Sequence, residues 1–311
     1  MSWFKHFEWK KFGTKLYDKV LGTDVFGRSA QVGFYFSFAF FPLLLFLVTL
    51  FGIILGSTTT LQAELFQYLA QIMPRDAYRL VQTTMGEIIE SSTGGKLTLG
   101  LLVTLWSASA GVDSLRNSLN SVYEVDEDRA WWYTKLQSLI VTLMFILLIG
   151  IALAALAAGW EMLGRGLALL GYQVTSPWAL SVIQWIGLAI VMIFSTAVIY
   201  SWLPSFEEFY WVWISPGAVV AIILWAVLTG AFRLYLQYFN SYNKAYGSLG
   251  AVIILMLWMY LTGMALLIGG AINSVLTEMS EGSGAREAQE HEKEHAVREL
   301  KKQEAKQRQN K

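Results

Sequence analysis

Five stretches of this chain are long and apolar enough to cross a lipid bilayer, and they restrict the folds that it can adopt. They cover about residues 33–55, 136–160, 178–203, 213–233 and 248–276. A helix needs about 20 apolar residues to cross the hydrocarbon core. A sixth stretch, about 97–112, is short, and it forms a span over 97–119 only if it continues into the polar sequence GVDSLRNSLN that follows. Only 15% of the residues are charged, against about 25% in soluble domains. The sequence therefore predicts an all-α integral membrane protein, a bundle of six transmembrane helices.

The distribution of lysine and arginine predicts how this bundle is oriented. With six spans, both termini lie on one side of the membrane. The segments on that side carry 17 Lys and Arg residues, whereas the opposite side carries six. Basic residues are enriched on the cytoplasmic side of membrane proteins, so both termini are expected in the cytoplasm.

Three regions follow from this reading. Residues 1–27 are expected to be a cytoplasmic basic amphipathic segment, with Trp9, Phe12, Leu16 and Val20 at helical spacing and lysines between them. Such a helix suits the surface of an anionic leaflet. Residues 28–278 form the transmembrane domain, with an external helical hairpin over 58–92. Residues 279–311 are a charged cytoplasmic tail, helical or disordered.

Composition and motifs argue against most enzymatic chemistry. The chain has no cysteine and three histidines, so thiolate metal sites are excluded. His291 and His295 match the H-E-x-x-H pattern of zinc metalloproteases. The flanking tail has almost no apolar residues with which to build a metal pocket, so a metalloprotease is only a remote alternative. We expect no catalytic residue, no metal, no cofactor and no nucleic-acid partner.

Polar residues within the spans are more informative, because they are costly in a membrane and so tend to face the interior of the bundle. Polar residues recur every three or four positions along the second span and form one stripe. Within this stripe, Asp113 and Arg116 are close enough to form an ion pair. The stripe is either the water-exposed cytoplasmic end of a helix or the polar wall of a cavity. In the first span, Pro42 predicts a fixed kink or, alternatively, a gate. The candidate cavity residues are Gln31, Tyr35, Pro42, Ser109, Asp113, Arg116, Asn117, Asn120 and Asn273.

Glycines in the last span have two expected roles. Gly263, Gly269 and Gly270 are expected to let neighbouring helices approach closely. Near the outer boundary, glycine permits an irregular backbone, which membranes tolerate only where it is buried or lines water. The candidate outer-mouth residues are Arg233, Tyr246, Gly247, Ser248 and Gly250.

Three segments carry a resemblance to a known family. They read RSAQVGFYFSFAFFPLLLFLVTLFG (28–52), LGLLVTLWSASAGVDSLRNSLNSVYEV (99–125) and the block from 215 to 276 that contains YGSLGA. Together they resemble the YihY/BrkB family of bacterial inner-membrane proteins. The resemblance implies six spans, cytoplasmic termini and an inner-membrane location. It also brings a historical ribonuclease BN label, regarded as a misassignment, and links to serum resistance and to transport of lipid or lipopolysaccharide precursors. Where family members are expected to carry a glutamate late in the last span, this chain has Ala271.

Two functions remain in competition at this point. The first is a transport-class protein that moves, or helps to move, a lipid or another amphipathic envelope molecule. The second is a non-transporting scaffold or regulator of envelope assembly. Membrane lipids are expected partners in both cases, together with an envelope-assembly or lipid-transport protein, and we expect no enzymatic activity.

Overall fold

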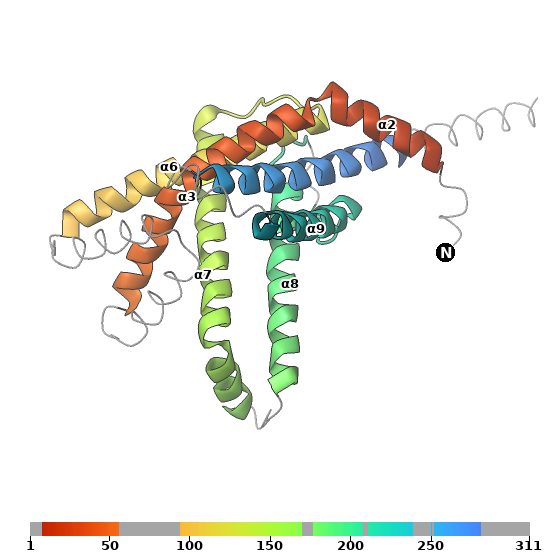
Figure 1. Ribbon diagram of the computed structural model, residues 1–311. Helices are drawn as coiled ribbons and strands as arrows, with labels where there is room; N and C mark the ends of the chain where they lie inside the picture. The colour runs from red at the N-terminus through yellow and green to blue at the C-terminus, as the bar shows by residue number, and fades with distance from the viewer. Residues whose placement is uncertain are drawn as a thin grey trace, which may run out of the picture.

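The structure is a computed structural model that describes residues 8–55, 94–169, 177–207, 211–238, 250 and 252–280. Within these residues it is all-helical (Figure 1). The predicted external hairpin 58–92 lies outside the described residues, as do residues 281–311 of the tail with His291 and His295. The same is true of Tyr246, Gly247 and Ser248.

Seven helices make up the described part of the chain. They are α2 (Trp9–Gly22), α3 (Val25–Leu55), α6 (Gly94–Tyr123), α7 (Trp131–Leu169), α8 (Pro177–Ser201), α9 (Pro216–Tyr238) and a last helix, Val252–Ser280. The helices α7 and α8 pack against each other as a long antiparallel pair (Figure 1), and α3 packs extensively against α6. Figure 1 shows α3, α6 and the last helix crossing one end of the α7–α8 pair. The site described below forms at this crossing.

Three of the described helices are long and apolar enough to cross a membrane. They are Trp131–Ala152, Pro216–Leu236 and Val252–Ser280, which overlap the third, fifth and sixth expected spans. Trp185–Ser201, within the fourth expected span, is a shorter apolar helix. Only 33%, 6% and 22% of the residues in their most apolar windows are buried in the isolated chain, as expected when the surrounding solvent is lipid. The chain is thus a membrane protein with at least these three candidate spans.

Pro42 lies inside α3, which continues to Leu55. A proline within a helix removes one backbone hydrogen bond and bends the helix. The ribbon of α3 bends part of the way along its length (Figure 1). This agrees with the kink predicted from the sequence.

Glycines allow the last helix to pack closely on its neighbours. A Cβ atom added to Gly33 of α3 would lie 2.7 Å from the backbone of Tyr260, and one added to Gly263 would lie 3.1 Å from Val32. A Cβ at Gly270 would lie 2.9 Å from Leu119 of α6. Close approach of this kind provides packing between helices in lipid, where the hydrophobic effect does not drive association. The packing role predicted for Gly263 and Gly270 is therefore what the structure shows.

The amphipathic helix α2 is docked onto the protein through its apolar side. Leu16 and Val20 pack against the main core cluster. Lys15 forms an ion pair with Glu278 at the end of the last helix, and Lys19 forms one with Glu124 at the end of α6. The apolar stripe read from the sequence as a lipid-facing surface thus faces the protein over these two residues.

Candidate functional site

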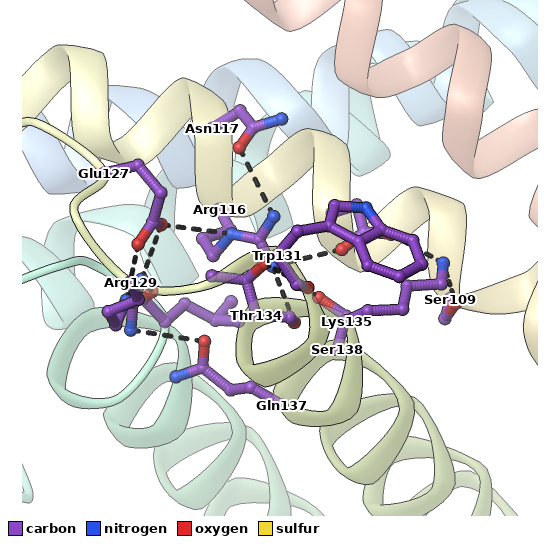
Figure 2. A network of polar contacts seen from close by, with 12 residues as sticks. Ser109, Arg116, Asn117, Glu127, Arg129, Trp131, Thr134, Lys135, Gln137 and Ser138 are labelled. Carbon is purple, nitrogen blue, oxygen red and sulfur yellow. Dashed lines mark hydrogen bonds and ion pairs between the residues drawn. The ribbon is translucent and has the colours of Figure 1, made fainter.

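The polar stripe of α6 meets the first two turns of α7, and Arg116 lies at the centre of this contact (Figure 2). Its side chain is only 7% exposed. Arg116 Nη1 donates to Asp113 Oδ1 at 3.1 Å, to the carbonyl oxygen of Thr134 at 2.8 Å and to Ser138 Oγ at 2.9 Å. The ion pair predicted from the spacing of Asp113 and Arg116 is confirmed. The structure adds that α7 supplies the other partners.

Lys135 of α7 joins the stripe from the other side. Its Nζ donates to Asp113 Oδ2 at 2.8 Å and to Ser109 Oγ at 2.7 Å. The same ammonium lies 4.5 Å from the centre of the Trp106 ring, close enough for a cation–π interaction. Asp113 is therefore shared by Arg116 and Lys135.

A second carboxylate, Glu127, lies in the connection between α6 and α7. Its oxygens accept hydrogen bonds from Arg129 Nε at 2.6 Å, Arg129 Nη2 at 2.7 Å and Asn120 Nδ2 at 2.9 Å. Arg116 Nε lies 3.4 Å from Glu127 Oε2, an ion pair without hydrogen-bond geometry. Three cations thus share two carboxylates in this cluster, which we call the charge network: Asp113, Arg116, Glu127, Arg129 and Lys135.

Arg129 of the charge network and two neighbouring amide side chains bind the segment that directly follows α8. Asn120 Oδ1 accepts from the backbone N–H of Ser205 at 2.9 Å, and Arg129 Nη2 donates to the carbonyl oxygen of Leu203 at 3.1 Å. Gln137 Nε2 donates to the carbonyl oxygen of Trp202. Trp202, Leu203 and Ser205 directly follow α8, which ends at Ser201, so these contacts anchor the C-terminal end of α8 to α6 and α7.

Asn273 connects the last helix to the beginning of α9. Its Oδ1 accepts from the backbone N–H of Gly217 at 2.8 Å, and its Nδ2 donates to Ser215 Oγ at 2.9 Å. Nδ2 also lies 3.4 Å from the hydroxyl of Tyr123, at the end of α6. An N–H at the first turn of a helix lacks an intrahelical acceptor, so Asn273 caps α9 from a different helix.

Electrostatics favour the ionised form of Glu127. Partial burial alone would raise the pKa of its carboxyl group. The hydrogen bonds from Arg129 and Asn120 and the charges of Arg129 and Arg116 outweigh this effect, so the pKa lies below its usual value. Glu127 therefore stays charged at neutral pH and keeps Arg116 and Arg129 paired.

Acidification should weaken this part of the fold. A carboxyl group whose pKa is lowered by folding stabilises the protein above its unfolded pKa, and this contribution is lost as pH falls through the folded pKa. Glu127→Gln should thus lower the melting temperature by a constant amount above about pH 5, and this difference should shrink towards pH 3. Thermal unfolding in detergent across this range measures it. Asp126→Asn, an exposed change in the same connection, should give no such trend; a pH-independent effect of Glu127→Gln would contradict the prediction.

The candidate cavity residues do not form one group. Ser109, Asp113, Arg116 and Asn120 join α6 to its neighbours, whereas Asn117 is exposed and lies 3.5 Å from Arg116 Nη2. Gln31 and Tyr35 are on the exposed side of α3, Pro42 is half-buried in the same helix, and Asn273 caps α9. Of the candidate outer-mouth residues, Arg233 is exposed on α9 and Gly250 is buried. The structure does not test the roles given to any of them.

Sequence reasoning did not single out Glu127, Arg129, Lys135 or Gln137 as site residues. Arg129 and Lys135 entered the prediction only within the 17 Lys and Arg residues counted on the cytoplasmic side. The available signal was the sequence from 124 to 129, directly after the polar stripe, where four acidic residues are followed by Arg129. Among the residues that the structure describes, no group of three His, Cys, Asp or Glu side chains is arranged to hold a metal ion.

Comparison with known proteins identifies relatives of the chain. Residues 16–295 match the family model described as virulence factor BrkB. The chain is also 31% identical over 251 residues to a protein of Bacillus subtilis named ribonuclease-like protein YfkH, a match that covers 80% of this chain and 89% of that protein. No solved structure matches.

Proposed function

The chain belongs to the virulence factor BrkB family of membrane proteins, and from the charge network we propose that it is a transport-class protein. It would move, or help to move, a lipid or another amphipathic envelope molecule across the bacterial inner membrane. The charge network would close the cytoplasmic end of the path.

The sharing of two carboxylates by three cations carries this proposal. Charged side chains are costly within or beside a membrane and usually mark a pathway or a paired cluster. Arg116 can keep one acidic partner while it releases the other, since both Asp113 and Glu127 lie within ion-pair distance. Exchange between partners would let α6 move against α7 without leaving a buried charge unpaired, which is the expensive state.

The proposal includes the six-span topology with both termini in the cytoplasm. Helix ends that this topology assigns to the cytoplasmic side contact one another in the structure. Examples are the end of α2 with the end of α6 (Lys19–Glu124, 2.9 Å) and the end of the last helix with the beginning of α9 (Asn273–Gly217, 2.8 Å). This clustering supports alternating spans whose inner ends meet.

A non-transporting scaffold is the second candidate, and one observation favours it. Within the described part of the chain, every charged group of the network has an ionic or hydrogen-bonded partner in the same chain. A network satisfied in this way can act purely as a structural clamp. In this case the charged tail 279–311 would recruit an envelope-assembly protein.

Reconstitution into liposomes tests the transport proposal directly. Wild-type protein should accelerate the movement of a labelled phospholipid or lipid-linked sugar between leaflets, relative to protein-free vesicles. If wild-type protein moves none of several labelled envelope lipids, the proposal is wrong.

Asp113→Ala and removal of residues 281–311 should separate the two candidates. In a transporter, Asp113→Ala should lower the movement rate by at least about tenfold, which corresponds to about 1.4 kcal/mol, because Arg116 and Lys135 lose their shared partner. The truncated protein should retain its rate. A tail-dependent scaffold predicts the reverse in a cell-envelope integrity assay. Melting temperatures of both variants, with Asp126→Asn as a charge-matched control, distinguish a lost function from a lost fold.

We further propose that the protein has no ribonuclease activity, although the Bacillus relative carries a ribonuclease-like name. The charge network contains no histidine, the usual general base at neutral pH. Incubation of purified protein with structured and single-stranded RNA tests this point. This proposal would be contradicted by RNA cleavage that co-purifies with the protein and is lost in a variant of the charge network such as Asp113→Ala.

A further inference from the structure

We propose that the outward side of α2, centred on Tyr17 and Leu21, sits in the headgroup region of the bilayer, and that aromatic and apolar contacts hold it there rather than lysine charge. This inference concerns the attachment of α2 to lipid and does not depend on the transport proposal.

The inward side of α2 is already occupied. Leu16 and Val20 pack on the core, and Lys15 and Lys19 are paired with Glu278 and Glu124. The Lys19 side chain is only 9% exposed. These two lysines are therefore committed to the protein and are not available to lipid.

The outward side of α2 is a separate stripe. Lys10, Gly13, Tyr17 and Leu21 recur at intervals of three and four residues, so they share one side of the helix. Tyr17 is 65% exposed and Leu21 is 51% exposed. A tyrosine joins an apolar ring to a polar hydroxyl, and such side chains favour the boundary between hydrocarbon and water.

The contacts of α2 place it at this boundary. Lys15 is paired with Glu278, which lies in the last turn of Val252–Ser280. This helix is long and apolar enough to cross a membrane, so its end lies near the bilayer surface. The ion pair holds α2 beside that end (Figure 1), and from this contact we infer that α2 lies near the same surface.

The charges that remain on α2 favour weak dependence on anionic lipid. Lys11 lies 3.3 Å from Glu8. Among the described residues of α2, Lys10 is the one lysine that has no carboxylate at ion-pair distance. The negative charge of exposed Asp18 offsets the positive charge of Lys10 on this helix. A single juxtamembrane cation is attracted only weakly to an anionic surface, so one offset lysine adds little to binding. The sequence alone predicts the opposite, a basic helix held by an anionic leaflet.

Spin labelling of the full-length protein tests this inference, since the chain has no native cysteine. Gly13→Cys provides a label on the stripe, where an added Cβ meets no heavy atom within 4 Å. Asp18→Cys provides a matched label on the exposed helix side next to it. Both proteins would be reconstituted in vesicles of neutral lipid and in vesicles that also contain anionic lipid. Collisions of each label with oxygen and with a water-soluble nickel complex would then be measured.

The label at position 13 should be several-fold less accessible to the nickel complex than the label at position 18, and this ratio should be the same in both vesicle types. The label at position 13 should stay accessible to oxygen. Tyr17→Asp with Leu21→Asp should remove this protection, and Lys10→Gln should leave it. Three results would overturn the inference. They are equal nickel access at both positions, protection only in anionic vesicles, and protection from both reagents, which would indicate a covering protein.

Discussion

Arg116→Ala should be among the most destabilising single substitutions in this protein, with a loss of about 3–5 kcal/mol in the free energy of unfolding. The change removes the side chain that holds Asp113, Ser138 and the carbonyl group of Thr134 together. Removal of one partner of a buried ion pair costs about this much. Asp113 keeps Lys135 and Glu127 keeps Arg129, so the loss comes mainly from the buried hydrogen bonds to Thr134 and Ser138 and from the space that the side chain leaves. Denaturant titration in mixed micelles, or the shift of the melting temperature in detergent, measures the effect.

Two further substitutions calibrate this result. Arg116→Lys keeps the charge but has no planar fork with which to reach several acceptors, so it should recover only part of the stability. Arg233→Ala removes an exposed arginine of α9 and should change the stability by less than about 0.5 kcal/mol. If Arg116→Ala is as mild as Arg233→Ala, the network is not the clamp described above.

Gly33→Ala should destabilise the contact between α3 and the last helix by about 1–3 kcal/mol, the usual cost of overpacking. The added Cβ would lie 2.7 Å from both the Cα and the N atom of Tyr260. These are backbone atoms, so rotation of a side chain cannot relieve the clash and one helix must move. The melting temperature in detergent should fall accordingly.

Gly13→Ala is the matched control and should have the opposite sign. Gly13 lies within α2, and an added Cβ there meets no heavy atom within 4 Å. Alanine is favoured over glycine in a helix by about 1 kcal/mol, so this variant should be as stable as wild type or more stable. A similar loss of stability for both variants would show that helix packing is not the reason for glycine at position 33.

The polar stripe on α6 shows how far sequence reasoning reaches into the site. Asp113 and Arg116 are three residues apart, and local helix geometry was sufficient to predict their ion pair. Lys135 is 22 residues from Asp113 and reaches it only because α6 and α7 cross at this point. Spacing within one helix carries no information about such a crossing, so the partners from α7 could not be predicted.

Asn273 and α2 illustrate the same limit. Asn273 was recognised as a costly polar residue in a span, and a cavity-lining role was predicted for it. Its contacts with Gly217, Ser215 and Tyr123 come from elements 56, 58 and 150 residues away in the sequence. The amphipathic pattern of α2 was also visible in the sequence, but not which of its sides would face the protein.

The sequence by itself determined that the chain is helical and lies in a membrane, because the length and apolarity of its segments have no other stable outcome in lipid. It also shows where the backbone carries no side chain, as at Gly33 and Gly263, and therefore where a neighbouring helix can come close. The tertiary structure alone decided which charges from different segments meet, because Lys135 of α7 reaches Asp113, and Glu127 reaches Arg116, only where α6, α7 and their connection pack together. The hydrophobic effect depends on the composition of each segment and not on the orientation of its neighbours. An ion pair or a close helix contact forms only when two segments that are distant in the sequence lie at the right distance and in the right orientation.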